Sequence, residues 1–357
     1  MPQPLTGRAA WTGAELEQSG DWIRSLNDTQ RQEIGAALGA VKRRGLPLFG
    51  FGREDFPLDT TAALLAEINE ELENGRGAVR LRGLDVEAYG EDELRQIFWG
   101  LGCHLGTALY QNARAEIMGE VRDESRFESK SYVTVEPGKV VSSRARARST
   151  GPLRWHTDRC DVIALLCVRN ALAGGVSKLA SIVTIYNEIL RRRPDLHAAL
   201  CQDYWRSRPA DEDGQHPERA FALPVFGVAD GKLTCQYSRT YVEQAQEFAR
   251  VPRLTAAQNE ALDLLAEVAD ETCLHSAFEP GDIQLLNNNV VFHGRTAYED
   301  DAASHHDRLL LRLWLAVPNS RRLPDGFEVL WGSTAPGAVR GGVIQPTTDS
   351  RVPLRAA

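Results

Sequence analysis

The sequence predicts a mixed fold in which strands form an apolar core and helices flank it. In residues 308–315, leucine occupies every second position from 309 on one face, and Arg308, Leu310, Arg312 and Trp314 share the other, as expected for a buried strand. Residues 161–168 form a second apolar run of strand length. Residues 29–44 and 60–74 instead repeat apolar side chains at helical spacing. These patterns favour an α+β fold with a mainly β core.

The first third of the chain, about residues 13–105, is predicted to be a helical layer that packs on this sheet. Apolar residues recur every three or four positions in three of its segments, whereas one short segment alternates like a strand. The helices are expected at residues 29–44, 60–74 and 92–101, and the strand at residues 78–84.

The middle of the chain, residues 105–154, is polar and irregular, which is typical of a functional loop. We interpret it as a lid, with Gln111 and Asn112 as candidate substrate contacts; the alternative is two surface amides. The arginine-rich run at residues 144–148 is predicted to be a solvated loop. The net charge is −8 and the basic residues are otherwise scattered, so a nucleic-acid partner is not expected.

The second half of the chain contains both helices and strands. Thr184 is the candidate cap of a helix over residues 185–193, which Pro194 ends, and His197 beyond it is predicted to be exposed. Residues 201–250 are predicted to be an insertion with short strands that supplies one wall of a pocket. A further helix is expected at residues 254–268, and a turn into a strand at residues 281–286.

The six cysteines show no Cys-x-x-Cys pairing, which is typical of a reduced, cytoplasmic protein. The chain begins without the basic and apolar segments of a secretory signal, and no run of about 20 apolar residues predicts a membrane span. Cys160 follows Asp158 by two positions. We interpret it as a small buried residue, with thiolate ligation as the alternative.

Two histidines and one carboxylate form the candidate metal site. His156 and Asp158 are two positions apart, and residues i and i+2 of a strand point to the same face. His293 lies far along the chain, so the fold must bring it to them. This ligand set is typical of a non-haem iron(II) centre, which leaves one face of the metal open. A His-x-Asp pair also arises by chance, so the interpretation depends on its neighbours.

Arg308 and Arg312 supply the second observation, because they share one face of an apolar strand. At roughly 3.3 Å per residue they lie about 13 Å apart. Buried arginine is rare unless paired, and guanidinium binds carboxylate in a fork geometry, so two anion sites in one cavity are expected. The alternative is two structural ion pairs with nearby Asp or Glu. The position of His293, upstream of the same strand, favours anion sites.

With these residues identified, the chain resembles the iron(II)- and 2-oxoglutarate-dependent oxygenases of the taurine dioxygenase (TauD/TfdA-like) family. The resemblance extends from about residue 153 to 318 and depends on the order and spacing of four motifs. These are Trp155-His156-Thr157-Asp158, Gly174-Gly175-Val176-Ser177, Phe292-His293-Gly294-Arg295 and Arg308-x-x-x-Arg312.

The resemblance implies a double-stranded β-helix (jelly roll) flanked by helices, as one domain over residues 1–357. The amino-terminal region, about 13–105, would be an extension that the shortest members lack. The co-substrates would be 2-oxoglutarate and oxygen. The site residues would be His156, Asp158 and His293 for iron(II), Ser177 and Arg308 for 2-oxoglutarate, and Arg312 for an anionic group of the substrate.

The implied reaction is oxidation of an unactivated C–H bond by hydroxylation, desaturation or ring closure. The implied substrate is a small carboxylate or amino acid of secondary metabolism or catabolism. The presence of Asp158 argues against halogenation, since related halogenases carry a small residue there. Three alternatives are an iron oxidase that needs no 2-oxoglutarate, a zinc hydrolase with the same triad, and a non-catalytic binding protein.

Overall fold

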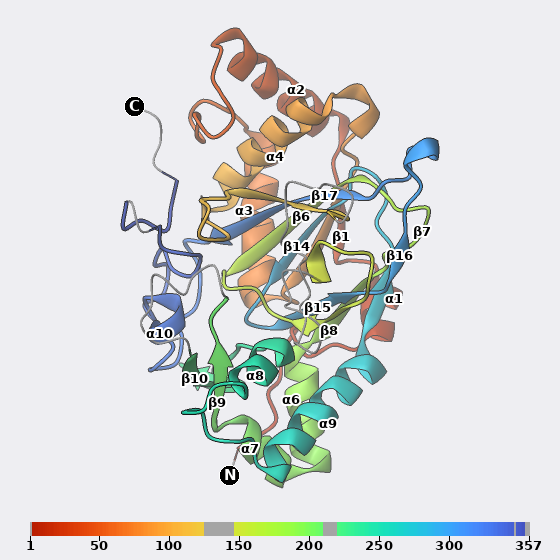
Figure 1. Cartoon of the computed structure of the whole chain (residues 1–357). Coiled ribbons are helices and arrows are strands. Elements are labelled where there is room, and N and C mark those ends of the chain that lie inside the picture. The colour runs from red at the N-terminus through yellow and green to blue at the C-terminus, as the bar shows by residue number, and fades with distance from the viewer. Residues whose placement is uncertain (1, 125–145, 210–219, 346–347, 354–357) are drawn as a thin grey trace.

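The computed structural model describes residues 2–124, 146–209, 220–345 and 348–353. Residues 125–145 of the predicted lid and 210–219 of the predicted insertion lie outside this description. The larger sheet has seven strands in the order β1-β2-β14-β6-β17-β3, with β4 also paired to β17 (Figure 1). In chain order these are β1 (Ile23–Ser25), β2 (Ala78–Arg82), β3 (Thr107–Ala108), β4 (Met118–Val121), β6 (Val162–Arg169), β14 (Ile283–Asn287) and β17 (Leu309–Ala316).

Strand β17 confirms the predicted alternation. Leu309, Leu311, Leu313 and Leu315 are buried in a core that they share with the amino-terminal helices. The opposite face of the strand carries Arg312, which lines the cavities of the candidate site. One strand therefore anchors the sheet to its helical layer and presents polar groups on its other side.

A second sheet of four antiparallel strands, in the order β13-β8-β15-β5, carries much of the site. Strand β15 lies between β8 and β5, and the register places His293 opposite His156. The strands are β5 (Leu153–His156), β8 (Ser177–Ser181), β13 (Leu274–Ser276) and β15 (Val291–Arg295).

Helices cover the two sheets on opposite sides of the molecule. In Figure 1, α2 and α4 lie at the top with α3 below them, whereas α6, α7 and α9 lie at the bottom. No helix within the described ranges has the length and apolar character of a membrane span. The helices are α1 (Gly13–Ser19), α2 (Asp28–Arg43), α3 (Thr60–Asn74), α4 (Glu91–Leu105), α6 (Ile182–Arg192), α7 (Pro194–Leu200), α8 (Arg239–Ala245), α9 (Ala256–Thr272) and α10 (Glu328–Trp331), with 3-10 turns η1 (Val86–Ala88) and η3 (Ala302–Ser304).

The region predicted as an insertion consists of two hairpins and a short helix, α8. The hairpin β9–β10 approaches the site. Strands β7 and β16, which are far apart in the chain, form a separate two-stranded sheet. These strands are β7 (Ala173–Gly174), β9 (Asp203–Ser207), β10 (Ala220–Pro224), β11 (Phe226–Ala229), β12 (Lys232–Cys235) and β16 (Tyr298–Glu299).

Two local predictions were wrong at the start of this second half: the cap at Thr184 and the exposure of His197. Helix α6 begins at Ile182, so Ser181 is its cap: the Ser181 hydroxyl accepts the backbone N–H of Thr184 at 3.0 Å. Pro194 ends that helix but also opens α7. His197, expected on the surface, is 1% exposed, because α7 folds back and places its ring against aromatic neighbours.

The run at residues 144–148 also differs from its prediction as a solvated loop. Residues 144 and 145 lie outside the described ranges, but Arg148 is buried. Its guanidinium pairs with Glu116 at 2.7 Å and with Glu124 at 2.9 Å. Two acids well upstream in the chain therefore draw this segment inward, toward the site.

Candidate functional site

The three predicted metal ligands come together in the structure. His156 ends β5, His293 is in the middle of β15, and Asp158 lies in the loop after β5. The expected strand geometry for His156 and Asp158 is therefore wrong, because the strand ends at the histidine. The turn that follows, rather than strand alternation, directs the carboxylate to the imidazoles.

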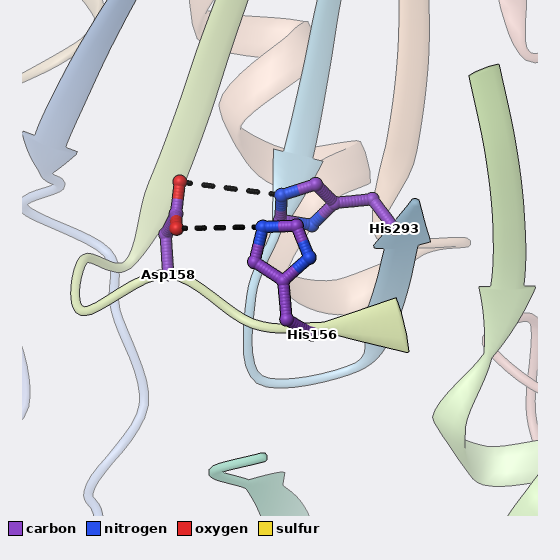
Figure 2. A group of neighbouring side chains, drawn as sticks. All are labelled: His156, Asp158 and His293. Atoms are coloured by element: carbon purple, nitrogen blue, oxygen red, sulfur yellow. Dashed lines mark ion pairs between the residues drawn. The ribbon is translucent and has the colours of Figure 1, made fainter. Parts of the chain in front are cut away.

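Figure 2 shows the carboxylate of Asp158 facing both rings. Its Oδ1 is 3.7 Å from Nε2 of His156, and its Oδ2 is 4.0 Å from Nε2 of His293. One ligand atom from each residue lies within 4.8 Å of the others. Among the described residues, this is the one such group of three. Two imidazole nitrogens and one carboxylate oxygen are the donor set of a facial iron(II) site.

The electrostatics of the triad fit a divalent metal. The Nδ1 of His156 lies 2.9 Å from the carbonyl oxygen of Arg154, which leaves its Nε2 facing Asp158. Burial lowers the pKa of His156, and it lowers that of His293 to about 3. Both imidazoles are therefore neutral at pH 7, the form that binds metal. The buried Nδ1 of His293 has no hydrogen-bond partner among the described residues.

Asp158 is held by groups that approach its other sides. The indole N–H of Trp314 donates to its Oδ2 at 2.9 Å, and the Arg312 guanidinium lies 3.7 Å from the same oxygen. Burial alone would raise the pKa of Asp158, but the Arg312 guanidinium, the two imidazoles and the Trp314 hydrogen bond together outweigh it, and the pKa is lowered. Asn288 accepts the backbone N–H of Asp158 at 2.9 Å, and its amide donates to the sulfur of Cys160 at 3.2 Å.

Cys160 is thus a buried neighbour of the ligand loop, and the metal-binding group does not include it. Burial raises the pKa of its thiol well above the ordinary value, so it stays protonated. All six cysteines are free, as their spacing predicts.

Two cavities meet at the triad. The first, called the sheet cavity here, lies between the strands and is lined by Ser177, Gln284, His293, Arg295 and Arg308. The second, called the insertion cavity, is lined by Arg206, Arg208, Phe221, Tyr241 and Leu330. Ala147, His156 and Arg312 line both cavities. Their empty volumes, with their mouths, are about 480 and 790 Å³.

Arg308 dominates the sheet cavity. Its side chain is buried, and it donates one hydrogen bond, of 3.4 Å, to the carbonyl oxygen of Val121. Burial lowers its pKa, and no described carboxylate forms an ion pair with it. A buried cation in this state is suited to an anionic ligand. Ser177, which hydrogen-bonds Gln284 at 3.3 Å, adds a hydroxyl to the same cavity.

The paired glycines of the second motif leave room for this arginine. Gly175 has a φ of +67°, and a side chain there would place its Cβ 3.1 Å from Nε of Arg308. Gly174 has a φ of +74°, and its Cβ would lie 2.2 Å from the carbonyl oxygen of Ala297. Glycine is therefore required at both positions for backbone conformation and for close packing.

Arg312 is engaged on two sides. Its Nε donates to the side-chain oxygen of Gln111 at 2.7 Å, and its guanidinium lies near Asp158. Gln111 in turn donates to the carbonyl oxygens of Ile117 and Arg312. Asn112 bonds within its own loop, donating to Glu116 at 2.6 Å. Neither amide lines the two cavities, so direct contact of Gln111 and Asn112 with a ligand stays a prediction.

Arg295 fixes the wall between the cavities, a role that its motif did not suggest. Its guanidinium donates to the carbonyl oxygens of Arg146, Ser149 and Gly151, at 3.3, 2.8 and 2.6 Å. The segment so held includes Ala147, which faces both cavities. The sequence signal that could have revealed this role is an arginine in a buried strand, close to a metal ligand.

Solved structures support the fold. An asparagine oxygenase in complex with Fe(II), 3-hydroxyasparagine and succinate matches with a TM-score of 0.62 at 17% identity. The match covers 82% of this chain and 93% of that one. The non-haem iron oxygenase OrfP, with Fe and α-ketoglutaric acid, matches with a TM-score of 0.59 at 14% identity, over 82% and 93% of the two chains.

Sequence relatives extend the similarity over almost the whole chain. FR-33289 synthase from Streptomyces rubellomurinus is 33% identical over 351 residues, or 94% of this chain and 97% of that protein. The taurine hydroxylase-like protein SAT17 from Stachybotrys chartarum is 30% identical over 331 residues, or 91% and 83%. The model of one protein family, described as taurine catabolism dioxygenase TauD, TfdA family, matches residues 42–314 of this chain.

The family match begins well before residue 153, where the four motifs start, and it includes most of the predicted amino-terminal extension. It confirms the expected class of enzyme, a dioxygenase that uses iron(II), 2-oxoglutarate and oxygen. This chain belongs to the TauD/TfdA family of iron(II)- and 2-oxoglutarate-dependent dioxygenases.

Proposed function

We propose that this enzyme oxidises an unactivated C–H bond of a small anionic substrate, a carboxylic acid or an amino acid, by hydroxylation, desaturation or ring closure. The observation that carries the proposal is the position of the triad at the junction of two cavities, each lined by arginine. In structural neighbours, the bound molecules include 3-hydroxyasparagine and (3S)-hydroxy-L-Arg, which makes an amino acid a natural first test.

Each part of the site has a proposed role. His156, Asp158 and His293 hold iron(II), which with 2-oxoglutarate and oxygen supplies the oxidising chemistry when bound. Arg308 pairs with the distal carboxylate of 2-oxoglutarate in the sheet cavity, and Ser177 donates a hydrogen bond to it. The substrate then occupies the insertion cavity. We also propose that the two sheets are the halves of a double-stranded β-helix within one domain.

Arg312 is proposed to orient the substrate, because it is the arginine shared by both cavities. Its contacts with Gln111 and Asp158 fix the guanidinium beside the triad. In this arrangement Gln111 supports the arginine, and Asn112 stabilises the neighbouring loop.

The test is succinate formation by the purified protein with iron(II), 2-oxoglutarate and oxygen. A panel of amino acids and carboxylic acids is compared with the corresponding amides. Acids should stimulate succinate release and gain one oxygen atom or lose two hydrogens by mass spectrometry. Omission of 2-oxoglutarate should abolish turnover; product formed without it, or hydrolysis with zinc(II), would contradict the proposal. Arg312→Gln should weaken the preference for the acid over its amide.

A further inference from the structure

Gln284 is a buried glutamine of strand β14 that lines the sheet cavity. The register of the larger sheet places it opposite Arg80 of β2. Its side chain lies between two polar groups, the Arg80 guanidinium on one side and the Ser177 hydroxyl on the other. Gln284 therefore connects a buried cation to a hydroxyl that belongs to the wall of the sheet cavity.

Arg80 is fully buried and its guanidinium is held by several contacts. One terminal nitrogen donates to the hydroxyl of Ser276 at 2.8 Å and to the carbonyl oxygen of Ala277 at 2.7 Å. The other donates to Oε1 of Gln284 at 2.7 Å. Burial lowers the pKa of Arg80 to about 10, so it remains a cation at neutral pH. The contacts of the first nitrogen thus fix the direction in which the second one points.

Arg80 determines the orientation of the Gln284 amide. A guanidinium only donates hydrogen bonds, so the Gln284 atom beside it must be the oxygen. The amide nitrogen is then directed to Ser177 and donates to its Oγ at 3.3 Å. Because a hydrogen bond from a charged donor is stronger than one between neutral groups, the reversed amide is disfavoured.

This orientation leaves the proton of the Ser177 hydroxyl available for a ligand. The hydroxyl has one proton to donate, and its oxygen accepts the N–H of Gln284. Oε1 of Gln284 also lies 3.3 Å from Oγ and can accept the proton before an anion binds. Since Oε1 already accepts from Arg80, the hydroxyl can turn to an anion without leaving a buried acceptor unpaired.

The charge and the dipoles of these three groups are also aligned. The positive charge of Arg80 polarises the Gln284 amide, whose N–H end points to Ser177, and hydrogen bonds in such a chain strengthen one another. The positive end of the chain is thus directed toward the cavity that Arg308 also lines. An anion in this cavity is favoured by a second cation that it does not touch.

We propose that Arg80 and Gln284 are positioning residues that set the Ser177 hydroxyl as a hydrogen-bond donor to the anion in the sheet cavity. This inference rests on the proposed function for the identity of that anion, the distal carboxylate of 2-oxoglutarate. The affinity for this carboxylate then depends on two residues that act on it only through Ser177.

The test measures binding of 2-oxoglutarate rather than turnover. The iron(II)-loaded protein is kept anaerobic, and equilibrium dialysis gives the Kd of 2-oxoglutarate and of 2-oxopentanoate, which has a methyl group in place of the distal carboxylate. Gln284→Met should weaken 2-oxoglutarate binding up to about fivefold, as for one hydrogen bond, and leave 2-oxopentanoate binding unchanged. Gln284→Glu offers only acceptors to the hydroxyl and adds a negative charge, so 2-oxoglutarate binding should weaken by more than about tenfold.

A double-mutant cycle separates positioning of Ser177 from a general effect on the structure. If Gln284 acts through the hydroxyl, Gln284→Met should cause little further loss of 2-oxoglutarate binding in a Ser177→Ala background. Additive losses in the double variant, or equal losses for both ligands in Gln284→Met, would overturn the inference. Wild-type affinity for 2-oxoglutarate in both Gln284 variants would do the same.

Arg80 is tested by two substitutions on the same strand. Arg80→Met should weaken 2-oxoglutarate binding about as much as Gln284→Met, whereas Arg80→Lys keeps a cationic donor and should retain most of the affinity. Arg82→Met is the matched control, because Arg82 shares Asp282 with Arg80 but has Glu279 as its other acidic partner. It should bind 2-oxoglutarate like wild type. An equal loss in Arg82→Met would overturn the role of Arg80, and if Arg80→Met does not fold, the Gln284 variants decide.

The same binding measurement separates this inference from the proposed function. Unchanged 2-oxoglutarate binding in both Ser177→Ala and Arg308→Leu would contradict the proposed site of the co-substrate, and the inference with it. Weaker binding in those two variants, together with wild-type binding in the Gln284 variants, would support the proposed site and overturn the inference alone.

Discussion

The two cavities beside the triad are built in different ways. The sheet cavity is walled by β8, β14, β15 and β17, whose positions are fixed by hydrogen-bonded register. The insertion cavity is walled by the hairpin β9–β10, by α8 and by α10. Strands hold groups more precisely than loops and hairpins do, whereas loops and hairpins vary more readily among relatives. Under the proposed function, the shared chemistry would be placed on the sheets, and substrate choice on the insertion.

The largest effect is expected from a variant that removes part of the triad, where the two cavities meet. Asp158→Ala deletes the carboxylate ligand, so turnover should be abolished and iron(II) affinity should fall by at least about 100-fold. Succinate release and equilibrium dialysis with iron(II) measure the two losses. Asp263→Ala, at an exposed acid on α9, should change neither. Full turnover by Asp158→Ala would show that the triad does not bind the catalytic metal.

Arg308→Leu should damage the sheet cavity alone. It leaves a buried 2-oxoglutarate carboxylate unpaired, which costs on the order of 3–5 kcal/mol. The KM for 2-oxoglutarate should rise by more than about 100-fold. Arg169→Leu, on the neighbouring strand with partners Glu91 and Asp307, is the control. An unchanged KM would mean that another residue binds the co-substrate.

Trp314→Phe should weaken metal binding without removing a metal ligand. It keeps an aromatic ring but loses the N–H that holds Oδ2 of Asp158. Loss of such an outer contact weakens metal binding by about 10- to 100-fold. Titration with iron(II) measures this, and Trp99→Phe, whose indole bonds the carbonyl oxygen of Phe51, is the control. Equal metal affinities in both variants would assign Trp314 to packing.

Ser177→Ala gives the smallest expected change. One hydrogen bond contributes about 1 kcal/mol, so the KM for 2-oxoglutarate should rise roughly fivefold. Ser177→Thr keeps the hydroxyl and should remain close to wild type. A loss as large as that of Arg308→Leu would show that Ser177 also supports the metal ligands.

The predictable parts of the molecule are those with strong periodicity. Helix α3 has the bounds that its apolar spacing predicts, and β17 buries its alternate leucines. The candidate ligands His156 and His293 could be proposed from residue type, although the turn that brings Asp158 to them could not be predicted. A turn has no repeating pattern from which its geometry can be predicted.

Other features depend on contacts between distant segments. His197 belongs to a seven-residue helix, too short for periodicity to indicate a buried face. Arg148 is drawn inward by Glu116 and Glu124, a pairing that only the fold creates.

The shared wall of Ala147, His156 and Arg312 has a thermodynamic consequence. A ligand that shifts this wall from one cavity changes the free energy of binding in the other. Such coupling is reciprocal: if substrate tightens 2-oxoglutarate binding by some factor, 2-oxoglutarate must tighten substrate binding by the same factor. Arg295 tethers the segment that contains Ala147. The rigidity of this segment would then determine how strongly binding in one cavity affects binding in the other.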